Sequence, residues 1–327
     1  MQKRMSFIVS LIVVIMMLTA LPFVAGTVQA ADPNKLVGGS ASLGGANYKI
    51  MSGWSLIIDR KMGKKVIIEA TGGPVANLKL IERNEAQVGV VTQSLAWEGF
   101  AGKGWADKKY VLSRAMFAVH VAYLDGIVLA KSGIKDFMDM GGKNISVGPA
   151  GGTPAVVVKR ICDFLGVKPN YRYLGQGDSM RSLKDGLIDG AIFMGGAPRP
   201  AFAQLGASVP VRSLHLTKEQ LDRVSKAFPQ YSTGVIKKGT YKYLEKDVHT
   251  LTDWYAYMVH KDLSDDLVYQ LTKTTFENLD EFKKVHKAVK IMAPENVVRC
   301  QVPLHPGALK YFKEKGINVP ERLIEGK

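Results

Sequence analysis

Residues 65–91, KVIIEATGGPVANLKLIERNEAQVGVV, contain one unit of strand, turn, helix and strand. The first six residues form an apolar run with β-branched side chains, which is typical of a strand. A Gly-Gly-Pro turn follows at residues 72–74, and Leu78 and Ile81 then lie at helical spacing. The next apolar run, at residues 87–91, predicts a second strand. We therefore expect a strand–helix–strand unit of a parallel sheet.

The same alternation continues through the middle of the chain. Apolar runs predict strands at residues 126–130, 143–148, 171–174 and 189–194, and helical spacing predicts helices at residues 156–165 and 180–184. Alternation of this kind indicates an α/β fold with a largely parallel sheet.

Two apolar runs, at residues 126–131 and 254–259, are expected to be strands that cross between two lobes. If both cross, residues 129–250 form a second lobe inserted into a discontinuous first lobe. The first lobe then comprises residues 31–128 and 251–327. After the second crossing strand, helices are expected at residues 266–278, 282–291 and 307–313.

Residues 1–30 have the layout of a signal peptide. Lys3 and Arg4 precede an apolar run at residues 7–18, and a small-x-small site ends at Ala30. The run of about 12 residues is shorter than the roughly 20 that a spanning helix needs. We expect cleavage near Ala30 and export of a soluble protein to the periplasm.

The chain is basic, with 44 Lys and Arg against 29 Asp and Glu in 327 residues and a formal charge of +15. Cleavage would remove Lys3 and Arg4 and two of those charges. The remaining basic residues are dispersed, with no block or aromatic signature that would favour nucleic acid. An anionic ligand, an anionic membrane surface and an ordinary solvated surface remain open explanations. Cys162 and Cys300 are either a disulfide or two separate buried thiols.

Glycine-rich turns follow several of the expected strands. They leave room for backbone amides to approach a ligand, and a helix start behind such a turn favours an anion. In an open α/β sheet, ligands bind at this edge. The turns lie at residues 38–45, 71–74, 148–153 and 195–198.

Sequence signatures of enzymes are missing. No turn ends in the Lys-Ser/Thr of a P-loop, no Gly-x-Ser-x-Gly elbow occurs, and the six histidines show no zinc-binding spacing. His120 is expected to be a strand residue with a hydrogen-bonded ring. We predict a protein that is not an enzyme, with no cofactor and no catalytic or metal-binding residues.

Taken in order, these segments resemble the TRAP-associated extracytoplasmic immunogenic (TAXI) family of solute-binding proteins over residues 35–315. The resemblance rests on the glycine-rich turns, on the strand QVGVVTQ at residues 87–93, on KDGLIDGA at residues 184–191 and on VPLHPGAL at residues 302–309. It implies a type II periplasmic binding fold, in which two α/β lobes enclose a ligand cleft. It also implies membrane subunits of a tripartite ATP-independent periplasmic (TRAP) transporter as partners.

The resemblance further implies a small carboxylate ligand, of the amino-acid or dicarboxylate type such as glutamate or 2-oxoglutarate. Tyr48 is also favoured by its position, because it follows a glycine-rich loop near an expected helix start. The expected ligand-binding residues are Ser40, Tyr48, Thr71, Asn77, Gln93, Gly152, Thr153 and Pro198.

The chain departs from the family pattern at two turns. The loop at residues 40–43 is longer than usual, and Pro74 replaces a small hydroxyl residue. Arg199, after the last turn, is either a charge partner for a second carboxylate or a surface residue. We expect a monomer. The alternative to transport is a periplasmic sensor that presents its ligand to a receptor kinase.

Overall fold

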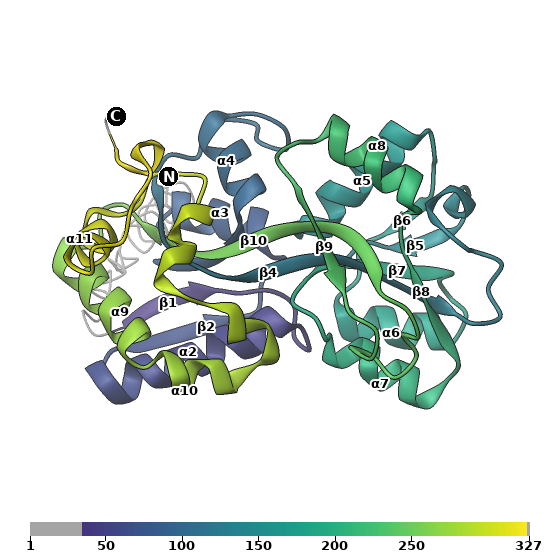
Figure 1. Cartoon of the computed structure of the whole chain (residues 1–327), viewed down its shortest axis with the longest axis horizontal. Helices are drawn as coiled ribbons and strands as arrows, with labels where there is room; N and C mark the ends of the chain where they lie inside the picture. The colour runs from purple at the N-terminus through teal and green to yellow at the C-terminus, as the bar shows by residue number, and fades with distance from the viewer. Residues whose placement is uncertain (1–34, 326–327) are drawn as a thin grey trace, which may run out of the picture. The chain divides into compact units, whose positions relative to one another are not determined.

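The alternation of strands and helices extends through residues 35–325, the part of the chain that the computed structural model describes (Figure 1). The predicted signal peptide and its cleavage site near Ala30 lie outside the described residues. Within the described part, the strands form one mixed sheet in the order β2-β1-β3-β10-β4-β7-β5-β6, with β8 paired to β4 and β9 to β10. The predicted α/β class is confirmed.

The first lobe begins with three parallel strands. Leu36 of the first strand pairs with Val66 on one side, and Gly38 pairs with Val88 on the other. Because right-handed crossovers lead to opposite edges of β1, α2 and α3 lie on opposite faces of the sheet (Figure 1). The elements are β1 (Lys35–Gly39), α2 (Ala46–Met62), β2 (Lys65–Glu69), α3 (Pro74–Glu82), β3 (Val88–Thr92) and α4 (Gln93–Ala101).

Two long antiparallel strands, β4 (Ser113–Leu129) and β10 (Val248–His260), continue from one lobe into the other (Figure 1). In the first lobe, Tyr255 of β10 lies between Thr92 of β3 and His120 of β4. Further along, Tyr123 of β4 pairs with Gly195 of the second lobe. The predicted strand at residues 126–131 covers only the end of β4, and the one at residues 254–259 lies inside β10. Strand β4 begins at Ser113, well before the start of its predicted strand.

The second lobe repeats the arrangement of the first. Its parallel strands β7, β5 and β6 pair with one another, and β7 runs antiparallel to β4. The elements are η1 (Phe137–Met140), β5 (Asn144–Ser146), α5 (Thr153–Leu165), β6 (Asn170–Arg172), α6 (Gln176–Lys184), β7 (Gly190–Gly195), α7 (Pro200–Ser208), β8 (Val211–Leu214), α8 (Lys218–Ala227) and β9 (Ser232–Ile236).

The chain then returns to the first lobe, where its last helices pack against α2 and β4 (Figure 1). Trp54 of α2 donates a hydrogen bond of 2.8 Å from its indole nitrogen to the hydroxyl of Thr275, and both are buried. The elements are α9 (Asp265–Glu277), α10 (Leu279–Val285), η2 (Lys287–Ile291), η3 (Pro294–Arg299), α11 (Pro306–Glu314) and η4 (Glu321–Leu323).

The single helix predicted at residues 282–291 is wrong. Helix α10 ends at Val285, and His286 adopts an extended conformation with φ −157° and ψ 145°. The Nδ1 atom of His286 accepts a hydrogen bond from the backbone N–H of Ala288 and so caps the short helix η2. The apolar spacing continues across the break, but the side-chain cap starts a new helix there.

The boundary predicted at 128/129 falls at the end of β4, and that at 250/251 falls inside β10. The division into lobes of residues 31–128 with 251–327 and of residues 129–250 stays a prediction. Cys162 and Cys300 are separate, buried, free thiols. Burial raises the pKa of Cys162 to about 11 and that of Cys300 to about 12, so both stay protonated at neutral pH.

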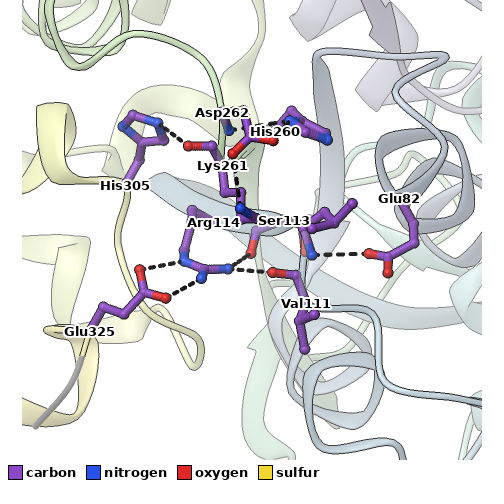
Figure 2. A network of polar contacts seen from close by, with 10 residues as sticks. Glu82, Val111, Ser113, Arg114, His260, Lys261, Asp262, His305 and Glu325 are labelled. Atoms are coloured by element: carbon purple, nitrogen blue, oxygen red, sulfur yellow. Dashed lines mark hydrogen bonds and ion pairs between the residues drawn. The ribbon is translucent and has the colours of Figure 1, made fainter.

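Arg114, at the start of β4, connects the end of the described chain to the first lobe (Figure 2). Its guanidinium donates to both carboxylate oxygens of Glu325 and to the carbonyl oxygens of Val111 and Ser113 at 2.7 and 2.9 Å. Arg114 is buried, whereas the Glu325 side chain is 56% exposed. The guanidinium therefore joins two segments from inside the lobe, the start of β4 and the end of the described chain.

We expect Arg114→Ala to lower the free energy of unfolding by about 2–3 kcal/mol, because hydrogen bonds to a charged group are lost inside the protein. Glu325→Gln should cost less than about 1 kcal/mol, because its carboxylate is mostly in water. Urea denaturation of both variants checks this. Equal effects of the two substitutions would contradict the proposed role of Arg114.

Candidate functional site

A cavity lies between the two lobes, where β1, β2, β5 and β7 end. It encloses about 40 Å³. The residues that line it come from the turns after these strands, from the helices that follow and from the crossing strand β10. They are Ala41, Ser42, Gly45, Ala46, Asn47, Gly72, Gly73, Pro74, Pro149, Gly152, Thr153, Pro154, Gln176, Phe193, Met194, Gly195, Gly196, Arg199 and Tyr255.

Four helices start at this cavity, and each has a glycine at its N-cap. Helices α2, α3, α5 and α6 follow Gly45, Gly73, Gly152 and Gly175, and none of these helices has a side-chain cap. Away from the cavity, α8 and α9 carry side-chain caps from Thr217 and Ser264. Glycine leaves the first turn of a helix without a side-chain acceptor, and that turn carries partial positive charge. The starts of α2, α5 and α6 therefore favour an anion in the cavity. Helix α3 contributes less, because Pro74 has no N–H and the N–H of Val75 donates to the carbonyl oxygen of Gly151.

Arg199, at the N-cap of α7, is the cationic side chain of the cavity wall and is 1% exposed. One Nη donates to the carbonyl oxygen of Tyr123 at 3.3 Å, and the guanidinium lies over the rings of Phe193 and Phe202. Its Nε has no hydrogen-bond partner. A buried guanidinium with unused donors can bind an anion strongly.

Asp125 and Tyr241 hold Arg199 from behind. The Oδ2 atom of Asp125 lies 3.8 Å from Nε of Arg199. The hydroxyl of Tyr241 donates to Oδ2 at 2.6 Å and accepts from the backbone N–H of Arg199 at 2.9 Å. Burial raises the pKa of Asp125, and the charge of Arg199 opposes this shift. The pair keeps the guanidinium in place inside the second lobe.

The opposite wall of the cavity is polar and neutral. His120 contacts Oδ1 of Asn47 at 2.8 Å through Nε2 and the carbonyl oxygen of Val121 at 3.0 Å through Nδ1. Tyr255 donates to the carbonyl oxygen of Met194 at 3.1 Å. Burial raises the pKa of Tyr255, and hydrogen bonds from the side chains of Thr153 and Asn47 lower it by less. The Tyr255 hydroxyl thus brings both lobes together at the base of the cavity.

The two lobes touch beside the cavity through backbone and hydroxyl groups. The N–H of Val75 donates to the carbonyl oxygen of Gly151 at 3.0 Å, and the hydroxyls of Thr92 and Thr153 lie 3.1 Å apart. A Cβ on Gly151 would lie 3.0 Å from the Cβ of Ala76. Any side chain at Gly151 would therefore make Ala76 move by a few tenths of an ångström, so glycine favours this close approach, which belongs to a closed form.

A second bridge between the lobes lies outside the cavity. Arg160 of α5 forms an ion pair of 2.8 Å with Glu98 of α4, and it also donates to the hydroxyl of Tyr231. The side chain of Glu98 is 4% exposed and that of Arg160 is 18% exposed. The bridge links the two lobes in the closed arrangement, and removal of either partner would leave the other charge buried and unpaired.

The predicted ligand-binding residues fall into three groups. Gly152 and Thr153 line the cavity. Ser40, Thr71, Asn77 and Gln93 instead form hydrogen bonds within the first lobe. Asn77 donates to the carbonyl oxygens of Ser40 and Val90, Thr71 bonds Ser40 and Asn77, and Gln93 accepts from the N–H of Gln301.

Tyr48 and Pro198 do not line this cavity, although each is the sequence neighbour of a residue that does. Their neighbours, Asn47 and Arg199, are buried. Sequence reasoning missed Asn47, Gln176 and Tyr255 and left the role of Arg199 open. The glycines before α2 and α6 are a signal that points to Asn47 and Gln176, whereas Tyr255 is placed by the pairing of β10.

No group of three or more potential metal ligands occurs within residues 35–325. Within the same residues, no helix has the length and hydrophobicity to cross a membrane.

His120 predicts a measurable pH dependence of stability. Burial lowers its pKa from 6.5 to about 4, so between these values the unfolded chain binds a proton that the folded chain does not. Stability from this residue is therefore present above pH 6.5 and falls as the pH drops toward 4, by about 3 kcal/mol in all. His286 and Arg199 face the same ring and lower its pKa further.

We expect His120→Gln to lose less stability than the unaltered protein between pH 7 and pH 4, in urea denaturation. The matched control is His249→Gln, which changes an exposed histidine and should give a curve parallel to that of the unaltered protein. Parallel curves for His120→Gln as well would contradict a buried neutral imidazole.

Gly151→Leu should prevent the lobes from closing, because its Cβ alone would lie 3.0 Å from the Cβ of Ala76 and the rest of the side chain would add to this contact. Small-angle X-ray scattering should then give a larger radius of gyration than for the unaltered protein. Gly133→Leu is the control, since a Cβ there meets no atom within 4 Å. A scattering profile of Gly151→Leu identical to that of the control would show that this contact does not limit closure.

Solved structures similar to this one include periplasmic binding proteins. The periplasmic binding protein BugD matches with a TM-score of 0.56 and 14% identity, over 88% of this chain and 99% of its own. A solved periplasmic transporter matches with a TM-score of 0.52 and 18% identity, over 87% of this chain and 93% of its own. An ancestral arginine-binding protein bound to arginine matches with a TM-score of 0.50 and 14% identity, over 79% of this chain and 98% of its own.

At these identities, the likeness shows the fold, which is the expected two-lobed periplasmic binding fold. The comparison by sequence goes further and covers most of the chain. A model described as the NMT1-like family matches residues 39–316, and the chain therefore belongs to the NMT1-like family.

Proposed function

We propose that this chain is an extracytoplasmic solute-binding protein that captures a small organic anion between its two lobes. The observation that carries the proposal is the buried Arg199 in a cavity that four glycine-capped helix starts surround. A cation with unused donors and helix N-termini around one enclosed space are complementary to a carboxylate. No step of covalent chemistry is required of these residues, so the proposed role is binding.

The proposed ligand contacts are made by residues that line the cavity. Arg199 would bind the carboxylate, and Asn47, Thr153, Gln176 and Tyr255 would supply the neutral polar contacts, with backbone amides near Gly152. Ser40, Thr71, Asn77 and Gln93 would hold the turns of the first lobe in position. Tyr48 and Pro198 would not contact the ligand themselves but would help to position their sequence neighbours Asn47 and Arg199, which line the cavity.

Capture would follow from closure of the lobes about the crossing strands. In the open form, the ligand would meet one lobe, and closure would bring Thr153 to Thr92 and Gly151 to Val75. A ligand that contacts both lobes binds the closed form better and so shifts the population toward it. Burial removes water from the ion pair with Arg199 and strengthens it.

The resemblance to the TAXI family supports a finer role. We propose export to the periplasm after cleavage near Ala30, and delivery of the ligand to the membrane subunits of a TRAP transporter. The ligand would be of the amino-acid or dicarboxylate type, such as glutamate or 2-oxoglutarate. A sensor that presents the same closed form to a receptor kinase is the alternative, and a pull-down from membranes with ligand present distinguishes the two.

Arg199→Gln should weaken binding of the ligand at least 100-fold, because the carboxylate loses its buried cationic partner. Isothermal titration against a panel of carboxylates, with native mass spectrometry for a co-purified ligand, measures this. Arg181→Gln is the control, since it makes the same charge change at an exposed position.

The substitution also leaves Asp125 without its partner, so folding needs its own control. The double variant Asp125→Asn with Arg199→Gln removes both charges and should fold like the unaltered protein. Full affinity in that folded double variant would rule out Arg199 as the anion-binding residue. Failure of every anion in the panel to bind the folded unaltered protein would overturn the proposed function.

A further inference from the structure

We infer that a groove outside the cavity is an anion-collecting site, where lysines of both lobes concentrate small organic anions at the entrance to the cavity. The groove encloses about 410 Å³, and its charged lining residues are Lys237, Lys238 and Lys287. The passage of the anion from the groove into the cavity rests on the proposed function, whereas the attraction of anions follows from the charges of the groove itself.

A single turn, between β7 and α7, separates the groove from the cavity. Gly195, Gly196 and Arg199 line the cavity. Ala197 and Pro198, which lie between them in the chain, line the groove. The groove and the cavity are therefore the two sides of one turn of the second lobe.

This turn packs directly against the first lobe. A Cβ on Gly196 would lie 2.8 Å from the Cβ of Ala288 in η2. The ring of His286, just before η2, forms a hydrogen bond with the backbone of Pro198. Opening of the lobes would separate Gly196 from Ala288 and join the groove to the cavity. The groove therefore lies where a solute would enter.

The groove is positively charged and mostly uncompensated. None of its lining residues is Asp or Glu, and all three of its lysines are exposed. Lys237 pairs with Asp247 at 2.9 Å. The ammonium groups of Lys238 and Lys287 form no ion pair within residues 35–325. One uncompensated cation thus comes from the second lobe and one from the first.

The positive charge continues from the groove to the cavity wall. Burial lowers the pKa of His286, and the charges of Lys49, Arg199 and Lys287 lower it further. Cations of both lobes therefore act on one ring at the contact that closes the cavity. A cluster of one sign raises the local concentration of counter-ions and speeds their association. Because the lysines line a recess, a small anion reaches them more readily than a flat membrane surface does.

A cysteine in the groove measures this potential without knowledge of the natural ligand. Thr240 lines the groove, and both native thiols are buried. In Thr240→Cys, the rate of reaction with the dianion dithiobis(nitrobenzoate) is compared with the rate for neutral dithiodipyridine. Both reagents attack the thiolate, so the ratio of the two rates reports the local potential and not the pKa of the thiol.

We expect Lys238→Gln with Lys287→Gln to lower this ratio at least threefold at low salt. The difference should disappear near 1 M salt, where charges more than about 3 Å apart are screened. The control is Lys226→Gln with Lys313→Gln, which also removes one exposed lysine from each lobe, but neither lines the groove. Equal ratios in the two double variants would overturn the inference. Loss of binding to phosphatidylglycerol vesicles, with the ratio unchanged, would overturn it in favour of a membrane-facing surface.

The passage into the cavity is tested by stopped-flow fluorescence with glutamate and 2-oxoglutarate, in the chain without Thr240→Cys. The groove variant should slow association at least threefold at low salt, and more for the dianion 2-oxoglutarate than for glutamate. Dissociation should be unchanged, because neither lysine lines the cavity.

The outcomes separate the inference from the proposed function. If both double variants associate at the same rate, the inference is overturned and a solute-binding role stands. If the folded protein binds neither compound and no other anion of the carboxylate panel, the proposed function is overturned, and the ratio of thiol reaction rates alone decides whether the groove collects anions.

Discussion

The antiparallel pairing of β4 with β10 is the constraint on which the rest of the molecule depends. These two strands belong to both lobes, so every other strand is positioned by reference to them. They also carry the groups at the base of the cavity, since His120 lies on β4 and Tyr255 on β10 and the two residues pair directly. Because both strands are continuous through the boundary, a change in the angle between the lobes must be absorbed by their twist or by the irregular pairing near Tyr255 and Ala256. The cavity and the hinge therefore share the same backbone.

The glycines around the cavity satisfy two requirements at once. As N-caps they cost only a few tenths of a kcal/mol relative to Ser or Asp, and they leave the helix starts open toward the ligand space. Across the cleft, a Cβ on Gly73 would lie 3.1 Å from Cα of Gly152, and a Cβ on Gly151 would lie 3.2 Å from the backbone nitrogen of Ala76, so a side chain at either position would crowd the opposite backbone. A serine cap at Gly152 would serve the helix, but its Cβ would lie 3.0 Å from the carbonyl oxygen of Pro149 in its own lobe and 3.3 Å from that of Gly72 in the other. The turns are thus shaped by the closed form more than by the stability of each lobe alone.

Much of the fold could be predicted from sequence, because most of the parallel strands are apolar runs and several are followed by a glycine-rich turn. The runs that became β2, β3 and β7 illustrate this, whereas the break at His286 depends on a side-chain cap that apolar spacing does not reveal. The site was predictable only as a set of turns. Successive helical residues point about 100° apart, so an assignment one residue away, Tyr48 for Asn47, changes which side chain faces the cavity. Asn77 and Thr71 are polar because they hold the turns together, and sequence does not distinguish that role from ligand binding. Tyr255 reaches the cavity through strand pairing across more than a hundred residues, which no local pattern encodes.

The contacts between the lobes set a limit on how the protein responds to a ligand. The pair of Arg160 with Glu98, the hydroxyls of Thr92 and Thr153 and the backbone bond from Val75 to Gly151 all join protein groups of the two lobes directly. If their sum were large, the empty protein would stay closed and no solute could enter. A ligand shifts the equilibrium only by the difference between its affinities for the two forms. That difference must come from contacts that a ligand makes with both lobes. Arg199 and Gln176 line the cavity from the second lobe, while Asn47 and the start of α2 line it from the first. A ligand that contacts both sets would supply the missing free energy of closure, and an anion that reaches only Arg199 would bind without closing the lobes.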